Sequence, residues 1–213
     1  MIANSNISIF HYGYLSSNYV SKGKGQRNYR IKKLMLQQEP NNPFLLFNMG
    51  NVCTQLNKFI EAANYYRKAL KYIDIKTKYA PSAFIGYITC QLKLGEIDKA
   101  IKYAEMCKSI YSDFVDIHYL TGDLYMRLGH LQKARRCFEI CLTLGEDTGI
   151  KYNSRVGVGS YLSFFKLAQI YQAKGETEKT YYYKAEGEKI KQKLLIHNPR
   201  LLGDGTSGFR TVD

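Results

Sequence analysis

The stretch Asn41–Leu70, NNPFLLFNMGNVCTQLNKFIEAANYYRKAL, predicts two short amphipathic helices joined by a tight turn at residues 56–58. Asn42 is a suitable N-cap, and Pro43 suits the first helical position, where its missing N–H costs nothing. Asn57 tolerates the left-handed conformation that ends a helix. Neither helix can bury its apolar stripe alone, so the pair must stack on neighbouring elements. The stripe of the first helix follows spacings of three and four: Leu46, Met49, Cys53 and Leu56.

The same frame returns three more times along the chain. With Pro43 as position 1, further copies start at Pro81, at Val115 and, in a weaker form, near Tyr161. Position 15 holds a residue that tolerates a turn, and position 20 is small in the first three copies. The residues at position 15 are Asn57, Gly95, Gly129 and Gly175, and those at position 20 are Ala62, Ala100, Ala134 and Thr180.

This frame resembles the tetratricopeptide repeat, a helix–turn–helix unit of about 34 residues. The resemblance implies an all-α fold, a right-handed α-α superhelix, with repeats near 43–76, 81–112, 115–146 and 161–196. Small residues at positions 8 and 20 let the two helices of a repeat approach closely. Ile88, Ala168 and Thr180 depart from this rule, so wider crossings are expected in the second and fourth units.

The flanks differ from the repeats. Residues 1–26 predict an extended segment with a short strand, followed by a basic linker, and residues 27–40 predict a half-repeat helix that caps the solenoid of residues 41–196. Residues 197–213 form a tail rich in Gly, Ser and Thr. The Gly157–Gly159 region is expected to be a hinge before the fourth repeat.

A second resemblance covers the order HYGYL (11–15), a basic linker and RNYRIKKLMLQQEPNNPFLLFNMG (27–50), with GVGSYLSFFKLAQIY (157–171) further on. It is similar to the end of bacterial family-2 glycosyltransferases, in which a GT-A catalytic domain precedes tetratricopeptide repeats. The resemblance implies that residues 1–15 are the tail of that domain. His11 is then either a metal ligand in an intact parent or a strand histidine with a local hydrogen bond.

Catalysis by this chain alone is not expected. GT-A enzymes hold a divalent ion and the sugar-nucleotide phosphates with an Asp-x-Asp motif, and these 213 residues contain none. The four histidines are scattered, and no phosphate-binding glycine loop of known spacing is present. No catalytic residue and no cofactor are therefore predicted.

The composition limits the partners and the compartment. The net charge of +13 is spread over helices, which argues against a nucleic-acid stripe, although 19 tyrosines keep that alternative testable by salt dependence. The sequence shows no apolar run of membrane length and no secretory signal, so a cytoplasmic location is expected. The five cysteines fit buried, reduced thiols. Cys137 and Cys141 lie one helical turn apart, but no further ligand is near, so no metal is expected.

Function should then lie on the inner face, which the resemblance assigns to the first helix of each repeat. Aromatic rings interleaved with amides suit an extended peptide or a helix of another protein. The alternative for the aromatic residues is packing between repeats. The leading hypothesis is the interaction module of a glycosyltransferase that binds an acceptor or partner protein or self-associates as a homodimer. The second is a stand-alone adaptor. The predicted groove residues are Phe47, Asn51, Gln55, Thr89, Lys93, Tyr119, Asp123, Arg127, Phe165 and Gln169.

Overall fold

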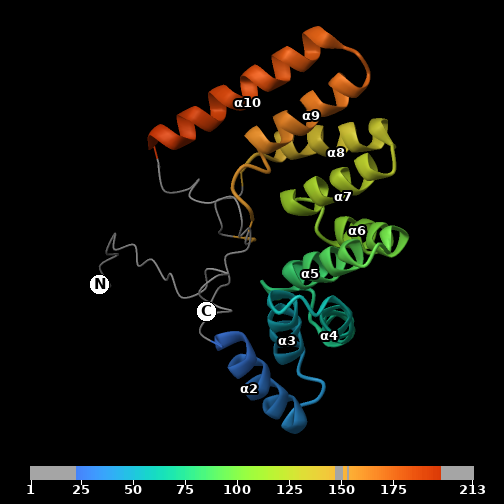
Figure 1. Cartoon of the computed structure of the whole chain (residues 1–213), viewed down its shortest axis with the longest axis vertical. Helices are drawn as coiled ribbons and strands as arrows, with labels where there is room; N and C mark the ends of the chain where they lie inside the picture. The colour runs from blue at the N-terminus through green and yellow to red at the C-terminus, as the bar shows by residue number, and fades with distance from the viewer. Residues whose placement is uncertain (1–22, 147–150, 153, 198–213) are drawn as a thin grey trace.

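The structure is a computed structural model, and it describes residues 23–146, 151–152 and 154–197. The described residues form helices only and contain no strand. The helices are α2 (Lys24–Gln38), α3 (Pro43–Gln55), α4 (Phe59–Tyr72), α5 (Ala80–Lys93), α6 (Ile97–Ile110), α7 (Val115–Arg127), α8 (Leu131–Leu144), α9 (Tyr161–Ala173) and α10 (Thr177–His197). Successive helices pack antiparallel in pairs, and the pairs stack into a curved rod (Figure 1).

Local signals set the helix boundaries. The Asn42 side chain accepts hydrogen bonds from the backbone N–H groups of Phe44 and Leu45 at 3.0 and 3.1 Å, and Pro43 opens α3. Each repeat then turns through a residue with positive φ at the same position. These residues are Asn57 (58°), Gly95 (78°), Gly129 (72°) and Gly175 (74°), which confirms the common frame.

The interior of the stack depends on small residues. Ala62, Ala100 and Ala134 are completely buried, as the register predicts. A Cβ atom on Gly50 would lie 2.7 Å from the ring of Tyr66, and one on Gly122 would lie 2.8 Å from the ring of Phe138. Each glycine therefore lets an aromatic ring of the second helix sit directly on the backbone of the first.

The second repeat replaces this glycine differently. Ile88 occupies position 8 and is fully buried, whereas Gly86, two residues earlier, faces the ring of Tyr66 at 2.5 Å from a hypothetical Cβ. The ring of Tyr66 thus lies between Gly50 of its own repeat and Gly86 of the next. In the second repeat, the glycine therefore allows close packing against the ring of the preceding repeat and not against a ring of its own repeat.

The capping helix is longer than predicted. It begins at Lys24, after Gly23 with φ of 62°, and not at Arg27, so the last residues of the expected linker are helical. It packs on α3 and α4 through Tyr29 and Leu36, which supports its role as a half-repeat. The predicted strand and His11 lie outside the described residues, as does the tail beyond residue 197.

All five cysteines are buried and free, and burial raises the pKa values of Cys53, Cys107 and Cys141 to about 12. Among the described residues, no cluster of three or more metal-binding side chains occurs. Within the same part of the chain, no helix is both long and apolar enough to cross a membrane.

Candidate protein-interaction surface

The ten predicted groove residues all lie on the first helices of the pairs. These helices, α3, α5, α7 and α9, lie toward the inner side of the curve (Figure 1). None of the ten side chains is buried. Gln55, Lys93, Arg127 and Gln169 are exposed, and the half-buried set is Phe47, Asn51, Thr89, Tyr119, Asp123 and Phe165. Whether they bind a ligand stays a prediction.

An aromatic group marks the surface of the first repeat. The ring centroid of Tyr79 lies 5.2 Å from that of Phe44 and 5.3 Å from that of Phe47. Phe44 nevertheless remains 51% exposed. The rings therefore pack partly against one another, as the alternative expected, and still offer apolar area to a partner.

Asn51 is less available than its position suggests. Its Oδ1 atom accepts a hydrogen bond of 2.7 Å from the hydroxyl of Tyr66, a residue of α4. Burial raises the pKa of that tyrosine. Asn51 thus helps to satisfy a buried hydroxyl, which is a structural role beside any contact with a ligand.

The predicted groove residues of the third repeat, Tyr119, Asp123 and Arg127, contact other side chains of the stack. Lys166 of α9 forms an ion pair with Asp123 of α7, and Arg127 lies 3.9 Å from the same carboxylate. Tyr119 packs edge-on against Phe138 at 5.4 Å, and burial followed by the charge of Asp123 raises its pKa. These side chains bridge elements, so a ligand must compete with existing contacts there.

Phe165 and Gln169 face a groove that the sequence did not reveal. It has a volume of about 660 Å³ and lies between α9 and α10. Its α10 side includes Tyr181, Lys184 and Glu188. These residues were missed because the repeat frame treats second helices as outer elements. The length of α10 could have pointed to these residues. This helix has 21 residues, whereas α4, α6 and α8 have 14 each.

The described residues 154–160 of the connection between α8 and α9 are packed against the third repeat, contrary to the hinge that the glycines suggested. Val158 is 1% exposed and contacts Val115 and Cys141. Glu146 accepts hydrogen bonds of 3.0 Å from the N–H of Gly157. A Cβ atom on Gly159 would lie 1.9 Å from the carbonyl oxygen of Gly145, so only glycine fits where the two backbones meet.

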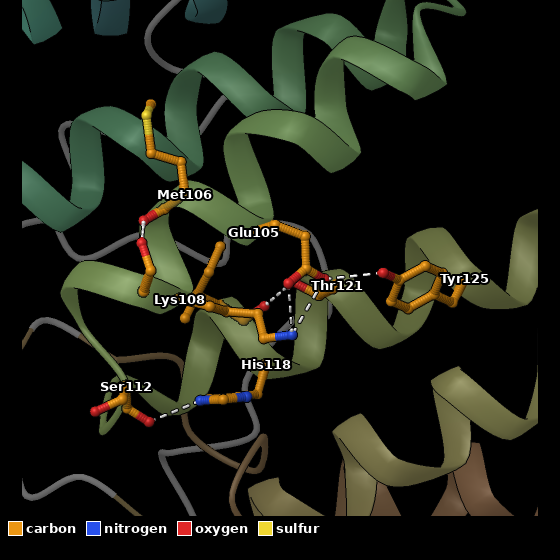
Figure 2. A network of polar contacts seen from close by, with 9 residues as sticks. Glu105, Met106, Lys108, Ser112, His118, Thr121 and Tyr125 are labelled. Atoms are coloured by element: carbon orange, nitrogen blue, oxygen red, sulfur yellow. Dashed lines mark hydrogen bonds and ion pairs between the residues drawn. The ribbon is translucent and has the colours of Figure 1, made fainter.

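A polar network joins α6 to α7 (Figure 2). Glu105 accepts a hydrogen bond from the Tyr125 hydroxyl at 2.9 Å and ion-pairs with Lys108 at 3.1 Å. Close by, the Nε2 atom of His118 donates to the main-chain oxygen of Ser112 at 2.7 Å. The histidine thus contacts a carbonyl group of the turn between α6 and α7 and not the serine hydroxyl, so this pair holds the turn and lacks the geometry of an activated nucleophile.

Known families and structures agree with this architecture. The tetratricopeptide-repeat family matches residues 43–73 and again residues 115–147. A crystal structure of MamA superposes with a TM-score of 0.67 at 17% identity, covering 86% of this chain and 98% of that one. YrrB, described as a tetratricopeptide-repeat protein with an unusual peptide-binding site, gives 0.61 at 17% identity, with coverage of 87% and 88%. The chain therefore contains tetratricopeptide repeats at residues 43–73 and 115–147, and its described residues have the fold of an α-helical solenoid.

Two proteins with similar sequences are glycosyltransferases. The SPbeta prophage-derived glycosyltransferase SunS of Bacillus subtilis (strain 168) is 29% identical over 125 residues, and the glycosyltransferase SunS of Bacillus phage SPbeta matches equally. The match covers 57% of this chain and 29% of each relative. The chain thus has a sequence link to a glycosyltransferase over less than a third of that enzyme's length.

Proposed function

We propose that this chain is a protein-interaction scaffold whose binding surface is the inner face of the stack. The main support is that the predicted groove residues on α3, α5, α7 and α9 remain accessible to solvent. Phe44 adds exposed aromatic area. Aromatic rings and amides on a rigid concave surface suit an extended segment or a helix of another protein. The fold is typical of proteins that bind and do not catalyse.

The finer proposal is that this scaffold is the non-catalytic region of a bacterial glycosyltransferase. The partial likeness to SunS supports it, together with the order of the N-terminal motifs. In that setting the groove holds an acceptor or partner protein, or joins two copies. Lack of activity by this chain alone and a cytoplasmic location stay predictions. A stand-alone adaptor is the alternative, and the coding sequence upstream of Met1 distinguishes the two.

Photo-crosslinking tests the position of the surface. A benzophenone amino acid is placed at Gln55 or Gln169 on the inner face, and at Lys102 or Arg136 on the exposed second helices. The proposal expects one discrete protein adduct from the two inner positions in cells, identified by mass spectrometry, and none from the outer positions. Equal labelling from both faces would contradict it.

A further inference from the structure

Helix α2, at the N-terminal end of the stack, is covered on one side only. Elsewhere in the described chain each second helix packs on the first helix of its own pair: α4 on α3, α6 on α5, α8 on α7 and α10 on α9. Helix α2 lies at the end of the rod (Figure 1) and packs on the next pair through Tyr29 and Leu36. Among the described residues, no first helix accompanies it. The side that such a helix would cover is therefore open.

This open side carries an apolar stripe. Ile31, Leu34 and Met35 share one face of the helix, and they are 49%, 63% and 44% exposed. Met35 and Cys107 of α6 each stand eight residues before the first helix of the next pair, which is α3 or α7. Cys107 is completely buried in a cluster that includes residues of α5. Met35 thus occupies a position that α6 buries and α2 leaves exposed.

Positive charge surrounds the stripe. Arg27 lies one helical turn before Ile31, and Arg30 lies one turn before Leu34. Both arginines are exposed, and neither takes part in an ion pair within the described part of the chain. These two arginines and the apolar stripe form what we call the end face of α2. The helix contains no Asp or Glu, and its basic residues are Lys24, Arg27, Arg30, Lys32 and Lys33.

The charge of α2 decides among the occupants of the end face. Residues 1–22 contain no acidic residue, and a second copy of α2 would place five more positive charges against the first five. A membrane would meet few apolar groups, since residues 31–35 advance only about 6 Å along the helix axis. That length suits the contact of one crossing helix, whose axis lies about 8–10 Å away. A helix with acidic residues beside an apolar stripe fits both the shape and the charge.

We propose that the end face of α2 docks an acidic amphipathic helix of a partner protein, which takes the place that a first helix holds in the other pairs. The apolar residues of that helix pack on Ile31, Leu34 and Met35, and its carboxylates pair with Arg27 and Arg30. The end face is separate from the ten predicted groove residues, which lie on α3, α5, α7 and α9. A failure of docking here would leave the inner-face proposal intact.

The probe is a stapled helical peptide of 15 residues, the length of α2, with Leu at spacings of three and four and Glu on both flanks. The same peptide with Lys in place of every Glu is the control. Hydroxyl-radical footprinting of the full chain compares three methionines: Met35 (44% exposed), Met106 (42%) and Met49 (0%). In the chain alone, Met35 should be oxidised as fast as Met106 and much faster than Met49. The acidic peptide should slow the oxidation of Met35 alone, at least ~3-fold, because docking excludes water from its side chain.

Fluorescence anisotropy of the labelled acidic peptide tests the role of charge. Arg27→Glu with Arg30→Glu changes the end face, and Lys102→Glu with Arg136→Glu makes the same change of charge on the exposed sides of α6 and α8. The end-face variant should bind the peptide at least ~10-fold more weakly than the outer variant. Equal affinities of these two variants, or equal binding of the Glu and Lys peptides, would overturn the proposal.

A second pair of variants tests the apolar stripe. Leu34→Ser should also weaken binding ~10-fold, whereas Ile60→Ser, at a residue of α4 that is 69% exposed, should leave the affinity unchanged. Met35 as slow to oxidise as Met49 in the chain alone would overturn the proposal, because residues 1–22 or a second copy would then cover the end face. Protection of Met35 by phosphatidylserine vesicles and not by the peptide would assign the end face to a membrane and would overturn the proposal as well.

Discussion

Single small residues decide how closely the helices of this stack approach. Ala134 is fully buried in a cluster with Phe138, Leu167 and Ile170, so it has no room for a larger side chain. Ala134→Leu should lower the free energy of unfolding by about 1–3 kcal/mol through overpacking. Urea denaturation measures this, and Ala185→Leu, at an exposed position of α10, is the control. Equal midpoints for the two variants would contradict the packing described above.

His118 should make the stability depend on pH. Burial lowers the pKa of this histidine below 6.5, and its Nδ1 atom lacks a hydrogen-bond partner. The unfolded chain therefore takes up the proton first, so the stabilisation is present at high pH and is lost as the pH falls below about 6.5. Replacing His118 by Gln should remove this loss, with a slope of up to about 1.4 kcal/mol per pH unit. Gln replaces an exposed histidine in the matched control, His130→Gln, and a loss of the same pH dependence in both variants would contradict the role of His118.

At the scale of elements, helix ends and turns can be predicted from the sequence, whereas contacts between residues far apart in the chain cannot. The N-cap at Asn42 and the positive-φ turns were predictable because their causes lie within a few residues. The contacts of Arg155 with Asp116 span 39 positions and leave no trace in the repeat frame. The frame also treats every first-helix residue as available, whereas Asp123 is paired with Lys166.

Asp116, in the first turn of α7, should also make the stability depend on pH. Burial raises the pKa of Asp116 to about 6, against 3.8 for a free side chain. Its charge therefore costs stability above pH 6, and the native state regains stability as the pH falls from 6 towards 4. Asp116→Asn keeps an acceptor for the N–H of Arg155 and should stabilise the protein by about 1–3 kcal/mol at pH 7.5. Thermal melts at pH 7.5 and 4.5 should show the gain disappearing at the lower value; a gain of equal size at both would argue against this burial.

At the scale of the whole molecule, the pairs of helices create a rigid curved surface with an uneven character. Aromatic area is exposed in the first repeat, acids and their internal partners occupy the third, and a groove opens between α9 and α10. Because a solenoid is stabilised by contacts between neighbouring repeats, exposed residues on its inner face are free to change without loss of the fold. Binding and folding can therefore be separated by mutation.

The most direct measurement is the affinity for the partner captured by crosslinking, compared between two charge-reversal variants. Lys93→Glu with Arg127→Glu changes the inner face, and Lys102→Glu with Arg136→Glu makes the same change of charge on the outer helices. Calorimetric titration should show at least ~10-fold weaker binding for the inner pair, about 1.4 kcal/mol, and native affinity for the outer pair. Equal losses in both variants, or a loss only in the outer pair, would contradict binding through the inner face.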